Sequence, residues 1–138
     1  MDPLDNLVKI GQRYVEPPDQ NEFSGMVESA RLSLTDAGVE VLSLESRFTL
    51  AYNASHALAR AALRWHGYRS DRRDIVFQCL AHTVGFERSH WHVLSECHRR
   101  RNLAEYEGHV EVDAQLLREL LSITVDLLAR VEALGPVD

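Results

Sequence analysis

Apolar residues recur along most of this chain at spacings of three and four, the repeat that places them on one face of an α-helix. The last such stretch is the clearest and contains Leu116, Leu120, Ile123, Leu127 and Val131. Similar stripes run through residues 21–37 and 43–66, and the second is rich in alanine, which permits close approach of helices. No useful length of chain alternates with period two. The pattern therefore predicts an all-α protein.

Glycines mark the ends of the predicted helices. Each of five glycines follows a segment with helical periodicity, where a left-handed residue is favoured: Gly38, Gly67, Gly85, Gly108 and Gly135. We predict a short helix at residues 3–13 and longer ones at about 21–37, 43–66, 72–84, 88–107 and 112–134. Asp71 and Asp74 resemble a capping pair at the start of the helix at 72–84. Short connections between such helices favour an antiparallel bundle of four to five helices.

Two adjacent prolines, Pro17 and Pro18, interrupt the pattern because they lack N–H donors and bias the preceding residue away from helix. We therefore divide the chain into an N-terminal arm, residues 1–20, and a helical bundle, residues 21–138. A chain of 138 residues is long enough for one hydrophobic core. Repeats, low-complexity tracts and a second domain are not evident.

No apolar run approaches the ~20 residues that a membrane-spanning helix needs. The opening sequence, MDPLDNLVKI, has acids where a signal peptide would carry basic residues. We therefore expect a cytoplasmic protein without a membrane partner. Cys79 and Cys97 lie within helical patterns, so we expect two small buried hydrophobic residues rather than a disulfide.

The net charge of −6 is unevenly distributed. Residues 58–101 contain nine basic and four acidic residues, a net charge of +5, which leaves −11 for the rest of the chain. An arginine-rich surface on an acidic body is compatible with a phosphate-bearing ligand. Charges scattered over solvated helix faces would explain the same count, and both interpretations stay open.

The seven histidines do not form a recognisable metal motif. His90 and His92 are two residues apart, which on a helix directs them to nearly opposite sides. The patterns HExxH and CxxC do not occur, and no glycine-rich phosphate loop is present. We expect neither a metal nor a cofactor. His56 follows Tyr52 by one helical turn, and we expect it to be a core histidine.

A polar stripe follows the apolar residues of the helix at 88–107. At ~100° per residue, His98, Asn102 and Glu105 share one side, with Arg101 and Tyr106 at its edges. A cation that clamps phosphate and a histidine that exchanges protons are the parts of metal-free phosphodiester cleavage. The alternative is a structural ion-pair network. In both cases we expect Arg101 to be partly buried and paired with an acid, with Glu105 one turn on as the first choice.

Two segments resemble the HEPN family, small helical bundles named after their eukaryotic and prokaryotic nucleotide-binding contexts. They are YNASHALARAALRWHGYR at residues 52–69 and the Arg-Asn pair in RRRNLAEYEG at residues 99–108. The resemblance covers about residues 21–135. Many members of that family are metal-independent ribonucleases, often toxins or defence proteins, that act as homodimers with the site at the interface. Others are noncatalytic RNA- or nucleotide-binding modules, frequently paired with a small nucleotidyltransferase.

The catalytic signature of the family is an Arg, usually followed by a polar residue such as Asn, and then a His four to six residues beyond. Arg101 and Asn102 match the first two places. Tyr106 stands where the His is expected, and His109 lies too far along, beyond Gly108. The resemblance therefore implies a homodimeric HEPN-like module with an RNA- or nucleotide-linked role and a degenerate ribonuclease site.

In that interpretation Arg101 and Asn102 contact phosphate, and Tyr106, Glu105 and His98 complete the pocket. One alternative is an active ribonuclease toxin of a toxin–antitoxin or defence system, with His98 as a substitute proton donor. Another is a structural homodimer without a ligand.

Overall fold

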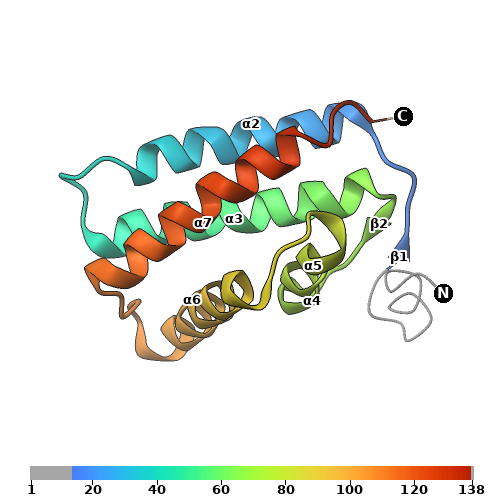
Figure 1. Ribbon diagram of the computed structural model, residues 1–138. Helices are drawn as coiled ribbons and strands as arrows, with labels where there is room; N and C mark the ends of the chain where they lie inside the picture. Colours follow the sequence, from blue (N-terminus) through green and yellow to red (C-terminus); the bar gives the residue numbers. More distant parts are fainter. Residues whose placement is uncertain (1–13, 138) are drawn as a thin grey trace.

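The computed structural model describes residues 14–137, which are mostly helical (Figure 1). The long helices are α2 (Gln20–Ala37), α3 (Leu44–Trp65), α6 (Arg88–Glu107) and α7 (Ala114–Glu132), and the short ones are α4 (Arg73–Gln78) and α5 (Leu80–Thr83). Two-residue strands β1 (Tyr14–Val15) and β2 (Tyr68–Arg69) pair antiparallel. The all-α prediction is confirmed. The short helix predicted at residues 3–13 lies outside the described residues.

The long helices begin at capped residues. Asp19, Ser43 and Asp113 precede α2, α3 and α7, and each side chain accepts a hydrogen bond from a backbone N–H in the first turn. α6 begins with a reciprocal cap in which the N–H of Glu87 donates to Nδ1 of His90 over 3.0 Å. These caps fix the starts of the helices that carry the polar stripe and the core.

Glycine ends the helices as predicted, with one exception. Gly67, Gly85, Gly108 and Gly135 adopt positive φ, which costs glycine little because it has no Cβ. Gly38 has φ −79°, so the prediction that it is left-handed is wrong. Its N–H donates to the carbonyl of Thr35 over 3.1 Å, and the last turn of α2 thus closes in the right-handed region.

The helix predicted at residues 72–84 is divided into α4 and α5. Cys79 lies between them, and its carbonyl accepts hydrogen bonds from His82 (2.9 Å) and Thr83 (3.0 Å) in a tightened turn. Cys79 and Cys97 are both buried, as expected.

The predicted capping pair at the start of α4 is wrong. Arg72 occupies the cap position, and no side chain caps α4. The carboxylates of Asp71 and Asp74 instead form ion pairs with Arg69 (2.6 Å) and Arg72 (2.9 Å). The local excess of arginine provides these carboxylates with cationic partners, which compete with the backbone N–H groups.

The core lies around α3, where Ala51, Ala54, Ala59, Ala61 and Ala62 are at most 1% exposed. These small side chains let α2 and α7 pack closely against α3. Figure 1 shows that α2 runs antiparallel to α3, as predicted, whereas α7 runs in the same direction as α3. The indole N–H of Trp65 donates to the carbonyl of Gly135 over 3.1 Å, which joins the ends of α3 and α7.

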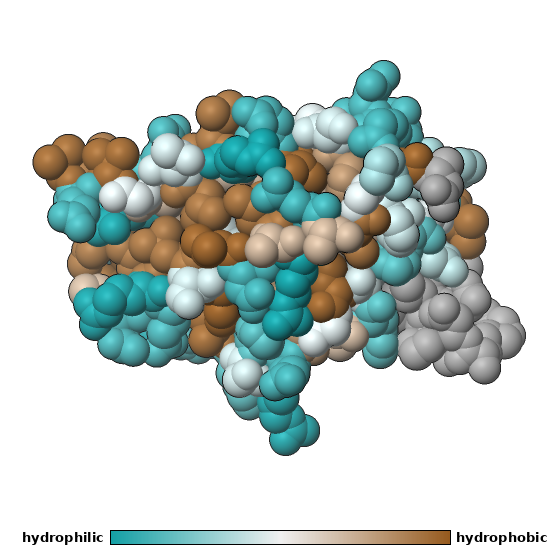
Figure 2. Space-filling view, turned by 45° about the horizontal axis from the view of Figure 1, so that its top comes forward, coloured by the Kyte–Doolittle hydropathy of each residue, from teal (hydrophilic) through white to brown (hydrophobic). Residues whose placement is uncertain are grey.

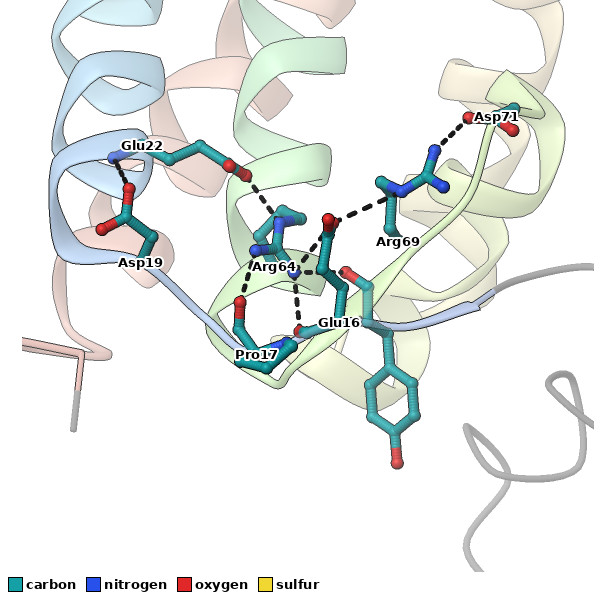
Figure 3. A network of polar contacts seen from close by, with 8 residues as sticks. Glu16, Pro17, Asp19, Glu22, Arg64, Arg69 and Asp71 are labelled. Atoms are coloured by element: carbon teal, nitrogen blue, oxygen red, sulfur yellow. Dashed lines mark hydrogen bonds and ion pairs between the residues drawn. The ribbon is translucent and has the colours of Figure 1, made fainter.

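Arg64, on α3, fixes the segment that precedes α2 (Figure 3). Its guanidinium, only 5% exposed, donates to the Glu22 carboxylate (2.5 Å) and to the carbonyls of Glu16 (2.8 Å) and Pro17 (2.7 Å). The Glu16 carboxylate also pairs with Arg69 over 3.3 Å. The described part of the predicted arm is residues 14–20, of which residues 14–19 are bound to the body and Gln20 is the first residue of α2.

Apolar side chains are exposed where α2 meets α3, and Figure 2 shows them at one end of the molecule. Val39, Val41, Leu42 and Leu44 contribute to this surface, and Val41 is 92% exposed. Within residues 14–137, no helix is both long and apolar enough to cross a membrane.

Candidate functional site

A chain of polar contacts links α3 to the polar stripe of α6. Nδ1 of His98 lies 2.9 Å from the hydroxyl oxygen of Tyr52, and Nε2 of His98 lies 3.2 Å from the amide nitrogen of Asn102. The predicted shared face of His98 and Asn102 is therefore present in the structure. We call Tyr52, His98, Asn102 and the neighbouring Arg73 and Arg101 the α3–α6 site.

The amide of Asn102 determines which nitrogen of His98 carries the proton. An amide nitrogen only donates, so Nε2 of His98 accepts and the proton of the neutral ring lies on Nδ1. The Nδ1 proton is then donated to the Tyr52 hydroxyl. The hydroxyl of Tyr52 thus accepts from His98 inside the protein, where Tyr52 is only 1% exposed.

Aromatic rings form one wall of the site. The Phe77 ring centroid, from α4, lies 5.8 Å from that of Tyr52, 6.1 Å from that of His98 and 5.6 Å from that of His56. All three are edge-to-face contacts, a preferred geometry for ring pairs. The rings hold Tyr52 and His98 in place while their polar atoms face each other.

Burial sets the ionisation of this pair. Burial lowers the pKa of His98, the nearby Asp74 opposes that change, and Arg73 adds to it. Burial also raises the pKa of Tyr52, and a hydrogen bond and the positive charge of Arg73 act in the opposite direction. Both groups are consequently neutral near pH 7.

Arg101 flanks this pair and acts on Tyr52 through its positive charge. Its side chain is 33% exposed, and its guanidinium lies 3.8 Å from the Glu105 carboxylate. The prediction that Arg101 is partly buried and paired with an acid is confirmed. Glu105 is 67% exposed, so water screens the pair and leaves the charge of Arg101 available to an anion.

The side chain of Tyr106 does not contact the other predicted site residues. It is 88% exposed, and no polar or ring contact to it is found within residues 14–137. The buried residues of α6, Leu94 and Cys97, lie in the middle of the helix, and most of the residues in its last turn are exposed. Tyr106 therefore does not complete a pocket within one copy of the chain.

Arginines of α3 and α4 form a neighbouring pocket that the sequence analysis did not single out. A hollow of about 250 Å³ is lined by His56, Arg60, Arg69, Ser70, Asp71 and Arg73. We call it the arginine pocket. Two features of the sequence could have indicated this pocket: the excess of basic residues between residues 58 and 101, and the spacing of Tyr52, His56 and Arg60 by one helical turn.

Arg73 connects the two regions. Its guanidinium carbon lies 5.8 Å from the centroid of the Tyr52 ring, within the range of a cation–π contact, and the same side chain lines the arginine pocket. His56 is half-buried and lines the arginine pocket, so it lies at the edge of the core rather than within it, where we expected it.

The described residues contain no group of three or more His, Cys, Asp or Glu side chains placed to hold a metal ion. Comparison of the chain with models of known protein families, with curated proteins and with solved structures gives no match.

Proposed function

We propose that this chain is an HEPN-like module that binds a phosphate-bearing ligand, RNA or a nucleotide, through Arg101 and Asn102. The observation that carries the proposal is the joining of Asn102 to the neutral His98–Tyr52 pair, with Arg101 and Arg73 beside it. The exposed Asn102 amide and the guanidiniums of Arg101 and Arg73 are the hydrogen-bond donors near this buried pair. Such donors suit phosphate oxygens, and the guanidiniums supply positive charge.

The proposed module binds without cutting efficiently. Metal-free cleavage of RNA needs one group to take a proton and another to give one. His98 is neutral, and both of its ring nitrogens are occupied by Tyr52 and Asn102. Tyr106, in the place of the family's histidine, is 88% exposed and has no polar or ring contact with this pair. These features support a degenerate ribonuclease site rather than the active ribonuclease toxin.

A homodimer belongs to the same proposal. The family resemblance implies dimers with the site at the interface, and exposed apolar atoms lie close to the site on α6. Leu103 and Tyr106 are 37% and 88% exposed and lie within one and a half turns of Arg101. The nucleotidyltransferase partner and the cytoplasmic location stay predictions from the sequence.

Binding and cleavage of labelled single-stranded RNA in excess chelator test the proposal. We expect the protein to bind RNA weakly, to lose affinity as salt is added because phosphate contacts release counterions, and to cleave at background rate. Arg101→Ala should weaken binding by about 3- to 10-fold. Arg99→Ala is the matched control, because Arg99 lies on the same helix and is paired with Glu96 at 2.6 Å.

Two outcomes contradict the proposal. Rapid cleavage that is abolished by Arg101→Ala or His98→Ala would establish the active ribonuclease. Absence of binding at every salt concentration would leave the structural homodimer, with the contacts of His98 and Asn102 serving only to hold α6 against α3.

A further inference from the structure

The arginine pocket contains more positive charge than the protein neutralises. Arg69 is engaged by Asp71 at 2.6 Å and by Glu16 at 3.3 Å. Arg60 and Arg73, in contrast, have no acidic partner within residues 14–137, although both line the same hollow. Two guanidiniums that share a pocket without a counter-ion favour the binding of an anion there.

His56 reports the positive field inside the pocket. Burial lowers its pKa most, and the charges of Arg73 and Arg60 lower it further, to about 4. Both guanidiniums are therefore close enough to act on the imidazole ring. At neutral pH the uncharged ring has one N–H to donate, so it adds a hydrogen-bond donor to the two cations.

The shape and the chemistry of the pocket fit a phosphate group. Its volume of about 250 Å³ exceeds that of a few water molecules, so a tetrahedral anion can enter. α3 supplies His56 and Arg60 one turn apart, and Arg73 is the first residue of α4, directly after the segment of residues 70–72. Ser70 holds this segment in its turn, since its hydroxyl accepts the N–H of Arg72 over 3.2 Å. Planar guanidinium groups recognise phosphate oxygens in pairs.

The arginine pocket adjoins the α3–α6 site. Tyr52 and His56 are one turn apart on α3, and Arg73 contacts the Tyr52 ring while lining the pocket. The two places are thus neighbours along one surface, with Arg73 between them. A ligand that occupies both places needs at least two phosphate groups.

We propose that the arginine pocket binds a second phosphate, adjacent to the phosphate at Arg101 and Asn102, and that the ligand is a single-stranded oligonucleotide rather than a mononucleotide. The identity of the ligand rests on the proposed function, whereas phosphate binding by the pocket does not. Arg60 makes the contact from α3, Arg73 makes it from α4, and His56 donates to the remaining oxygen.

The first test uses inorganic phosphate and NMR of the histidine side chains. Phosphate in the pocket should shift the His56 signals in a saturable manner in the wild type and equally in Arg101→Ala. In Arg60→Gln the shift should require about 3- to 10-fold more phosphate. Arg60 is exposed and has no acidic partner in the described chain, so this variant should fold normally. No saturable shift of His56, or an unchanged titration in Arg60→Gln, would overturn the pocket.

The second test compares a 5′-mononucleotide with short single-stranded RNA, in chelator, by fluorescence anisotropy. We expect the RNA to bind more tightly than the mononucleotide, and Arg60→Gln to weaken RNA binding by about 3- to 10-fold. The slope of the logarithm of the binding constant against the logarithm of the salt concentration should fall in magnitude by about 0.7 in this variant, the value for one phosphate contact of a single strand. Arg118→Gln, which removes one exposed arginine from α7, is the control and should stay within about twofold.

The outcomes separate the two proposals. If Arg101→Ala weakens RNA binding and Arg60→Gln does not, the second phosphate site is wrong and the proposed function stands. If Arg60→Gln matters and Arg101→Ala does not, the pocket stands and the proposed function is wrong. Equal affinity for mononucleotide and RNA would overturn the assignment of an oligonucleotide.

Discussion

The charge of His56 depends strongly on its surroundings. Burial, Arg73 and Arg60 depress its pKa from 6.5 to about 4 in the folded protein. The unfolded chain therefore takes up a proton more readily than the folded chain below pH 6.5. The stability associated with His56 is fully present above that pH and is lost progressively as the pH falls towards 4.

We predict that His56→Gln makes the protein less sensitive to acid. Glutamine does not titrate, so the variant should lose about 1–2 kcal/mol less of its free energy of unfolding than the wild type between about pH 7.5 and 5. Urea unfolding at the two pH values measures the difference. His82→Gln, at an exposed histidine of α5, provides the control. The same acid loss in His56→Gln and wild type would contradict the prediction.

Arg64 is the second residue with a large predicted effect. We expect Arg64→Lys to lower the free energy of unfolding by about 2–4 kcal/mol, because one ammonium cannot serve the Glu22 carboxylate and the two carbonyls of Glu16 and Pro17 together. Thermal or urea unfolding measures the loss. Arg31→Lys affects an exposed arginine and should cost at most about 0.5 kcal/mol. Equal losses in the two variants would show that the Arg64 network is not stabilising.

The long helices were predictable because each contains enough turns for the apolar repeat to be read. α2, α3, α6 and α7 begin and end within two residues of their predicted bounds. α4 and α5 are too short for this repeat to show the break at Cys79. The β1–β2 pair and the contacts of Arg64 were not predictable, since they join residues far apart in the chain by backbone groups that carry no side-chain pattern.

Replacement of glycine by alanine should change the stability of the protein in opposite directions within a helix and directly after one. Gly25 lies inside α2, and a Cβ there would meet no atom within 4 Å, so Gly25→Ala should stabilise the protein by about 0.5–1 kcal/mol. Gly108 ends α6 with φ +82°, where alanine is strained, so Gly108→Ala should destabilise it by about 1 kcal/mol. Denaturant midpoints of the two variants give the comparison. Changes of the same sign would refute this account.

At the scale of the whole molecule, helical spacing alone brought Asn102, His98 and Arg101 together, since all three lie on α6. The contributions of Tyr52 and Arg73 to the α3–α6 site depend on how α3 and α4 pack against α6, and no local sequence pattern predicts this packing. The same holds for Tyr106, since its 88% exposure depends on how α6 packs against the other helices and not on its position in the stripe.

We predict that the protein in solution is a homodimer with a mass of about twice 15.7 kDa, measured by light scattering at micromolar concentration. Leu103→Glu should shift the mass towards that of one chain, because it places a charge at the exposed end of α6 beside Arg101. Leu32→Glu, at a 59% exposed leucine of α2, should leave the mass unchanged. A wild-type mass of one chain would refute the dimer.

The exposure of Tyr106 has a consequence for how such a protein changes over generations. A tyrosine codon becomes a histidine codon through a single base change, and a side chain that is 88% exposed can be exchanged with little effect on packing. Under the proposed function, selection on nucleolytic chemistry at this position is therefore separate from selection on folding. A change between tyrosine and histidine at this position would alter the chemistry at the end of α6 and leave the stability of the fold nearly unchanged.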